Sequence, residues 1–261
     1  MKLFKNALIY DGTGCDAFIG DILVENDRIT KVEADIIPKD GWEVIDLTGL
    51  SVSSGFIDAH SHNDWFAIKN HPQKYFEPFI RQGITSFVAG NCGLSAVGFE
   101  PQSQHVEKVG GGLFSYTDTT GVYPTVGEFF SAIDRNTPCN IAVLAGHCTS
   151  RTSVAGYENR PLTDAEHSKM LQIMEDALKE GACGLSLGLM YEPGIYAGID
   201  ELKEVARLCE KYDRPMTVHP RACSAVSMTY PLLGRPHLLR ALDELVEIAS
   251  GTRMKLHYSH A

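Results

Sequence analysis

The sequence lacks several features that mark whole classes of protein. No apolar run approaches the ~20 residues of a membrane-spanning helix, and repeats and low-complexity tracts are absent. The N-terminus, MKLFKNALIYDG, turns polar too quickly for a signal peptide. Basic residues number 23 against 33 acidic ones, for a net charge of −10, which argues against nucleic acid or an anionic membrane as partner. We therefore expect a cytoplasmic protein that binds neither.

Cysteine pairs of the CxxC type are also missing, although the chain has seven cysteines. An odd number at irregular spacings argues against a disulfide framework and favours a reducing compartment. We expect six of the seven to be small core hydrophobes. The exception is Cys92, which follows a predicted strand.

Two sequence patterns divide the chain. Residues 1–52 have short alternating segments, including a strand over 3–10 and a hairpin around Asn26-Asp27, which predicts a small β-sheet module. Residues 53–261 alternate strands with helices, which is typical of a parallel sheet with crossover helices. A (β/α)8 barrel needs eight strands, so the six expected here predict an incomplete, TIM-like α/β barrel. The expected strands are 55–59, 85–89, 140–145, 183–187, 216–218 and 254–258.

Three helices can be placed by their apolar stripes and end signals. Thr163 and Glu166 have the spacing of a capping box at the start of the clearest one. Asp200 is expected to cap a second helix. A third covers about 238–249, and its inward residues are expected to be Leu242, Leu245 and Val246. The Gly-, Ser- and Thr-rich stretch 100–125 between the strands predicts either a disordered segment or a loop over a functional site.

Metal-ligand side chains follow several of the expected strands. His60 and His62 are two residues apart, so both imidazoles can reach one ion if the strand continues through them. Cys92, His219 and His260 end three other strands. The carboxyl ends of barrel strands meet at one rim, and imidazole and thiolate are ligands that zinc prefers. The pattern predicts a zinc site, where the metal would lower the pKa of water to about 7 and polarise a carbonyl.

Two further histidines fit this site less well. His147 follows another strand, but a structural hydrogen-bonding role is an equal alternative. His257 is three residues before His260, so it is expected on the opposite face of its strand.

The motifs around these residues resemble a known family. GFIDAHSHND (55–64) resembles the first-strand signature of the metal-dependent amidohydrolase superfamily. GNCGLS (90–95) is similar to the narrower N-acyl-D-amino-acid deacylase (D-aminoacylase) family, in which cysteine replaces a carboxylated lysine. The family's later motifs follow in order as GHCTSR (146–151), GACGLSLGLMYEPGIYA (181–197), TVHPR (217–221) and YSH (258–260).

This resemblance implies zinc-dependent hydrolysis of the amide bond of N-acyl-D-amino acids, giving a D-amino acid and a carboxylate. It implies that residues 1–52 are part of a small β-sandwich. Tyr191 and Arg221 would contact the small-molecule substrate. Cys92 would join a tightly bound zinc to a second, weaker one: the tight site would be held by Cys92, His219 and His260, and the weak site by His60, His62 and the shared Cys92.

One departure from the family leaves alternatives open. The family's catalytic aspartate ends strand eight and has no counterpart here, so we assign no catalytic residue within the chain and expect the aspartate to lie beyond Ala261. The chain would then be an N-terminal portion, completed by a missing C-terminal segment or by self-association. The alternatives are a cyclic amidohydrolase of the dihydroorotase or hydantoinase kind, which would use a lysine ligand, and an inactive metal-binding fragment.

Overall fold

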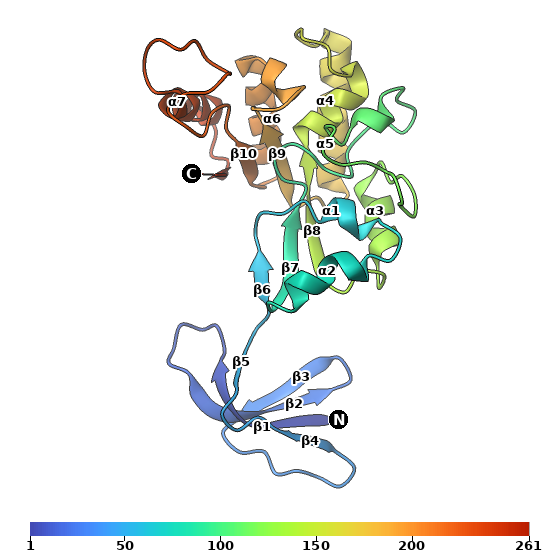
Figure 1. The fold of residues 1–261 in the computed structure, drawn as a ribbon, viewed down its shortest axis with the longest axis vertical. Helices are drawn as coiled ribbons and strands as arrows, with labels where there is room; N and C mark the ends of the chain where they lie inside the picture. The colour runs from blue at the N-terminus through green and yellow to red at the C-terminus, as the bar shows by residue number, and fades with distance from the viewer. Residues whose placement is uncertain (261) are drawn as a thin grey trace. The chain divides into compact units, whose positions relative to one another are not determined.

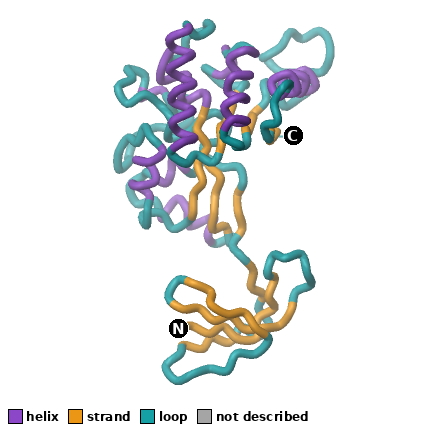
Figure 2. Tube along the Cα trace, turned by 180° about the vertical axis from the view of Figure 1, so that it is seen from behind, coloured by secondary structure: helices purple, strands orange, loops and turns teal. Residues whose placement is uncertain are grey.

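The computed structural model describes residues 1–260 and divides into two compact units, Met1–Phe56 and Ile57–Ala261 (Figure 1). The smaller unit consists of strands and loops, whereas the larger unit combines strands with helices (Figure 2). Among the described residues, no helix is both long enough and apolar enough to cross a membrane.

The smaller unit is one five-stranded sheet with the order β3-β2-β1-β4, in which β5 also pairs with β1. The predicted hairpin is confirmed, and Asn26 takes the left-handed conformation that its tight turn needs, with φ of 54°. The β-sandwich stays a prediction. The strands are β1 (Lys2–Tyr10), β2 (Phe18–Glu25), β3 (Arg28–Glu33), β4 (Glu43–Asp46) and β5 (Ser51–Ser53).

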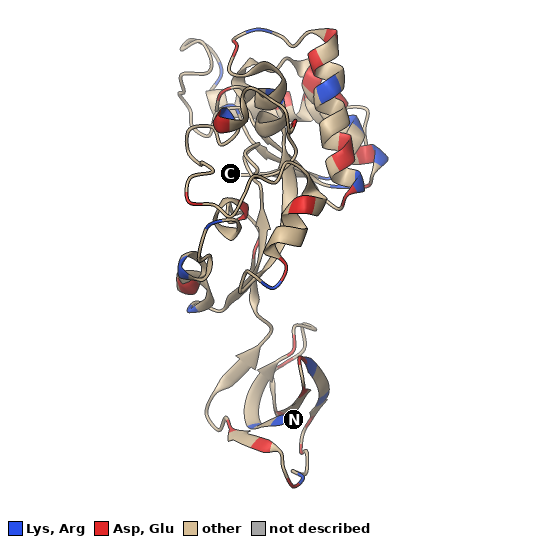
Figure 3. Cartoon of the chain, turned by 90° about the vertical axis from the view of Figure 1, so that its right-hand side faces the viewer, with Lys and Arg blue, Asp and Glu red and all other residues tan. Residues whose placement is uncertain are grey.

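The larger unit contains a curled six-stranded sheet in the order β11-β10-β9-β8-β7-β6, which is half of a barrel. Neighbouring strands from β7 to β11 pair in parallel, and all six predicted strands are confirmed. The six strands together contain one Lys, Arg, Asp or Glu residue, Asp58. The charged residues of the larger unit lie mostly on helices and loops (Figure 3). The strands are β6 (Phe56–Asp58), β7 (Ile84–Ala89), β8 (Asn140–Gly146), β9 (Gly184–Gly188), β10 (Met216–His219) and β11 (Leu256–Tyr258).

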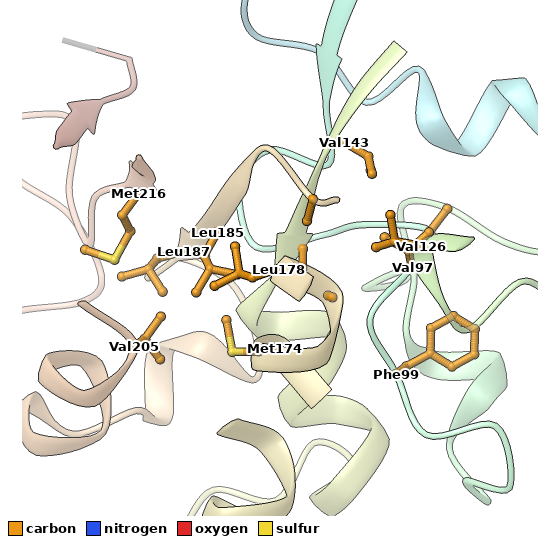
Figure 4. Close-up of a cluster of buried hydrophobic side chains, with 14 of the residues drawn as sticks. Val97, Phe99, Val126, Val143, Met174, Leu178, Leu185, Leu187, Val205 and Met216 are labelled. Carbon is orange, nitrogen blue, oxygen red and sulfur yellow. The ribbon is translucent and has the colours of Figure 1, made fainter. Parts of the chain in front are cut away.

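The main core lies between this sheet and the crossover helices (Figure 4). Leu185 and Leu187 of β9 point the same way and pack with Met174 of α5 and Val205 of α6. Ser186 between them points to the other face, which is the interior of the half-barrel. The helices are α1 (Asp64–Ala67), α2 (Gln73–Ile80), α3 (Val126–Ile133), α4 (His147–Ala155), α5 (Asp164–Lys179), α6 (Ile199–Lys211) and α7 (His237–Ala249), with 3-10 turns η1 (Val106–Lys108) and η2 (Gly194–Tyr196).

Two helix predictions need correction. The N-cap residue of helix α6 is Gly198 and not Asp200. Asp200 lies in the first turn, where its negative charge interacts favourably with the helix dipole. In α7 the buried stripe is Ala241, Leu245 and Ile248, so Leu245 is inward as predicted. Leu242 and Val246 are each one residue further on, about 100° around the helix axis, and are 45% and 65% exposed.

The predicted capping box of α5 is confirmed and gives a test by pH. The Glu166 carboxylate accepts from Thr163 N at 2.8 Å and from Arg160 Nη1 at 2.7 Å. The Arg160 guanidinium lowers the pKa of Glu166 from 4.5 to about 2. Because the folded pKa lies below the unfolded one, the stabilisation is present above pH 4.5 and is lost as pH falls towards 2.

Glutamine keeps an oxygen that can accept in the capping box, so Glu166→Gln removes mainly the charge that pairs with Arg160. Because solvent screens this ion pair, we expect the variant to lower the free energy of unfolding by about 0.5–1 kcal/mol at pH 7. The difference should nearly vanish near pH 2 in urea titrations. The exposed Glu107 supplies the control Glu107→Gln. An equal difference at both pH values would contradict this account.

Candidate metal centre

Three predicted ligands meet at the rim of the half-barrel. His60 follows β6, Cys92 follows β7 and His260 follows β11. Cys92 Sγ lies 3.4 Å from His60 Nε2 and 3.5 Å from His260 Nε2. One ligand atom from each residue lies within 4.8 Å of the other two. Because β6 and β11 are opposite edges of the sheet, this meeting depends on the curl of the sheet.

The other two predicted ligands lie next to this cluster. The ring centroid of His219 is 4.5 Å from that of His260, and its Nδ1–H donates to Pro220 O at 3.0 Å. Its Nε2 is thereby left with a free lone pair. The His62 ring lies 6.1 Å from that of His60, and its Nδ1 is buried without a partner in the described part of the chain.

The donor set fits zinc. It combines a thiol with imidazoles. The buried His62 Nδ1, which has no hydrogen-bond partner among the described residues, could serve as a further metal ligand. Burial lowers the pKa of His60 to about 4, so its imidazole is neutral and able to bind metal at pH 7. Burial also raises the pKa of Cys92 to about 12, so the thiol would lose its proton only when a cation compensates the charge.

The two predicted substrate residues differ in their surroundings. The Tyr191 ring is 4.7 Å from that of His219, and burial raises the pKa of its hydroxyl to about 12, which keeps it a hydrogen-bond donor. Arg221 is 9% exposed and pairs with Glu244 at 2.9 Å, while Nη1 donates to Ile195 O at 2.6 Å. Its substrate contact stays a prediction, because most of its donors already have partners within the protein.

The stretch 100–125 packs beside the predicted ligands. Phe114 stacks on the His62 ring at 5.0 Å and on Trp65 at 5.6 Å. Of the two alternatives, a loop over the site therefore agrees with the structure and a disordered segment does not.

The less favoured histidines lie outside the cluster. His147 is buried, and its Nε2 is 2.7 Å from Glu201 Oε1, which also accepts from Arg151 Nε at 3.0 Å. His147 therefore has the structural hydrogen-bonding role that was the alternative to metal binding. His257 is exposed and does not join the cluster. The prediction that all other cysteines are core hydrophobes is wrong for two loop residues, Cys15 and Cys223, which are exposed.

Sequence reasoning missed the side chains that hold the Cys92 turn. The buried Asp64 carboxylate accepts from Gly90 N at 3.2 Å and Ala96 N at 2.8 Å, at the two ends of the turn. Burial raises the pKa of Asp64 to about 7 against the opposing effect of these amides. Ser186 Oγ accepts from Gly93 N at 3.0 Å. Asp64 directly follows His62-Asn63 in the sequence. This closeness to a predicted ligand was the sequence signal that could have identified it.

The turn also requires glycine beside Cys92. Cys92 itself has φ of 56°, which is uncommon for a residue with a side chain. Gly93 follows with φ of 73°, and a Cβ there would lie 2.7 Å from both Cys148 Sγ and Gly188 N. Only a glycine allows this close approach of β7, β8 and β9 at their carboxyl ends.

Comparison with known proteins supplies independent matches. A model described as the Amidohydrolase family matches residues 43–257. The N-acyl-D-aspartate deacylase of Alcaligenes xylosoxydans xylosoxydans is 30% identical over 261 residues, covering 99% of this chain and 48% of that protein. The D-aminoacylase of the same organism is 29% identical over 262 residues, covering 99% and 50%.

A solved structure is similar over the same span. The crystal structure of N-acyl-D-glutamate deacylase from Bordetella bronchiseptica, complexed with zinc and a phosphonate inhibitor, has a TM-score of 0.78 and 29% identity. The match covers 98% of this chain and 50% of that one. The chain thus spans about half the length of the relatives it matches.

The packing of Gly93 gives a test with a matched control. Gly93 and Gly112 both have φ of 73°, but a Cβ on Gly112 would meet nothing within 4 Å. Gly112→Ala should lower the free energy of unfolding by about 1 kcal/mol through the backbone alone. Gly93→Ala should cost roughly 1–3 kcal/mol more through overpacking, and should weaken zinc binding. Equal effects in urea unfolding and zinc titration would contradict the proposed contact.

Proposed function

Because the chain belongs to the amidohydrolase family, we propose that the whole protein hydrolyses the amide bond of N-acyl-D-amino acids in a zinc-dependent reaction, releasing a D-amino acid and a carboxylate. The observation that carries the proposal is the position of Cys92 Sγ, 3.4 Å from His60 Nε2 and 3.5 Å from His260 Nε2. The deacylase relatives and the zinc complex of one of them support it. The proposal concerns the whole protein because the chain spans about half of these relatives. We expect this enzyme in the cytoplasm.

Cys92, His219 and His260 are assigned to a tight zinc site, and His60 and His62 to a weaker one that shares Cys92. The contact between the His219 and His260 rings, at 4.5 Å, supports the first group. The 6.1 Å separation of the His60 and His62 rings leaves room for an ion near both. Zinc held there would supply a Lewis acid that polarises the acyl carbonyl and activates water.

The protein's own groups would bind and orient the substrate. Tyr191, beside His219, keeps its proton and can donate a hydrogen bond to a substrate oxygen. Arg221 lies two residues after His219. It would contact the substrate only through guanidinium N–H groups that do not already donate to Glu244 or Ile195 O. No carboxylate of residues 1–260 joins the cluster of His60, Cys92 and His260 side chains. We therefore assign proton transfer to an aspartate in another part of the whole protein. Such a part, or self-association, would cover the β6 and β11 edges.

A cyclic amidohydrolase is less favoured. Such enzymes resemble this chain at the His60–His62 motif but use a lysine ligand, whereas a cysteine occupies the cluster here. An inactive metal-binding protein stays an alternative that the following assay decides.

The decisive assay uses the protein from its complete reading frame, loaded with zinc and checked for metal content. We expect release of free D-amino acid from N-acetyl derivatives of D-aspartate, D-glutamate or D-methionine, measured by chiral chromatography, and no release from the L-isomers. Hydrolysis of hydantoin or dihydroorotate instead would favour the cyclic amidohydrolase. Absence of any turnover by the zinc-loaded protein would refute the proposal.

Cys92→Ser tests the metal assignment separately. Serine removes the thiolate that zinc prefers, so we expect zinc affinity to fall by at least about tenfold and activity to fall with it. Cys15→Ser changes an exposed cysteine and serves as the control. Unchanged zinc affinity in Cys92→Ser would remove Cys92 from the site.

A further inference from the structure

A buried amide links the strand ends that carry the ligands. Asn91 is fully buried, and its Nδ2 donates to Val88 O at 3.0 Å and to Ser61 O at 3.4 Å. Its Oδ1 accepts from Thr217 Oγ1 at 3.1 Å. Backbone carbonyls can only accept, so the two carbonyls fix which end of the amide is the NH2 group. The hydroxyl of Thr217 therefore faces the oxygen and is the donor.

Each partner of Asn91 lies next to a predicted ligand. Ser61 lies between His60 and His62, and Asn91 itself precedes Cys92. Thr217 is two residues before His219 in β10, so both side chains point to the same face of the sheet. One side chain thus contacts the segments that carry four of the five proposed ligands.

The linkage replaces contacts that the sheet does not provide. Ser61 N also donates to Val88 O at 3.0 Å, so the end of β6 is held to the end of β7 through the same acceptor that Asn91 uses. Strand β10 is not a sheet neighbour of β7, because β8 and β9 lie between them. The Thr217–Asn91 hydrogen bond crosses the interior of the half-barrel and fixes the distance between the two strand ends.

From this geometry we propose that Asn91 is the positioning residue of the metal centre, which sets the separation of the β6, β7 and β10 ligands through the Ser61 carbonyl and the Thr217 hydroxyl. The inference rests on the proposed metal site, and it assigns to Asn91 no contact with metal or substrate. Residues that orient metal ligands typically change metal affinity 10–100-fold when substituted.

The test uses near-isosteric variants at both ends of the hydrogen bond. Asn91→Asp places an oxygen against two carbonyl oxygens, and Thr217→Val removes the hydroxyl while keeping the shape. Thr217→Ser keeps the hydroxyl and should behave as wild type. Asn140→Asp is the control, because Asn140 Nδ2 joins β8 to β7 at the opposite end of these strands, 3.5 Å from Thr85 O.

Cobalt(II) titration is the readout, with folding checked by circular dichroism. We expect both disruptive variants to bind cobalt about 10- to 100-fold more weakly and to show a changed sulfur-to-cobalt charge-transfer band, with Thr217→Ser and Asn140→Asp unchanged. If the wild type shows no such band, the proposed metal site fails. If the wild type shows it and the folded Asn91→Asp and Thr217→Val proteins keep its affinity and spectrum, Asn91 has only a structural role and the inference is overturned.

Discussion

The geometry of the candidate metal centre depends on how the turn of residues 90–96 is held after β7. This turn is buried, and buried backbone amides need hydrogen-bond partners. Side chains from other elements supply these partners. The Asp64 carboxylate accepts hydrogen bonds from the amides of Gly90 and Ala96, and Ser186 Oγ accepts from that of Gly93. Thr149 Oγ1 accepts from the amide of Ser95 at 2.9 Å. The left-handed conformation of Cys92 persists because these partners determine the backbone on both sides of it.

This arrangement brings the candidate ligands together with two of them, Cys92 and His60, in their neutral forms. Burial keeps the Cys92 thiol protonated and the His60 imidazole neutral at pH 7. Taking charges out of water is costly without compensation, so the Cys92 thiol keeps its proton until a cation pairs with the thiolate. A divalent ion would therefore enter a preformed set of donors, and its binding would be coupled to loss of the Cys92 proton.

Much of the fold followed from local pattern, while long-range partners did not. The six strands were predictable because each is a short apolar run with a polar end, and the predicted ligands lie at four of those ends. Leu245 of α7 was predicted correctly, but Leu242 and Val246 were wrongly placed inward, because the apolar residues of this helix cover more than one stripe and only packing selects among them. The Arg221–Glu244 pair and the Asp64 contacts join residues 23 to 32 positions apart, which spacing along the chain does not indicate.

X-ray absorption at the zinc edge of the zinc-loaded protein is the most direct test of the metal assignment. The account predicts a mixed coordination shell with a sulfur at about 2.3 Å and nitrogens at about 2.0–2.1 Å. The sulfur signal should come from Cys92, which lies between His60 and His260 in the cluster. A shell of nitrogen and oxygen alone, with no sulfur, would contradict the account.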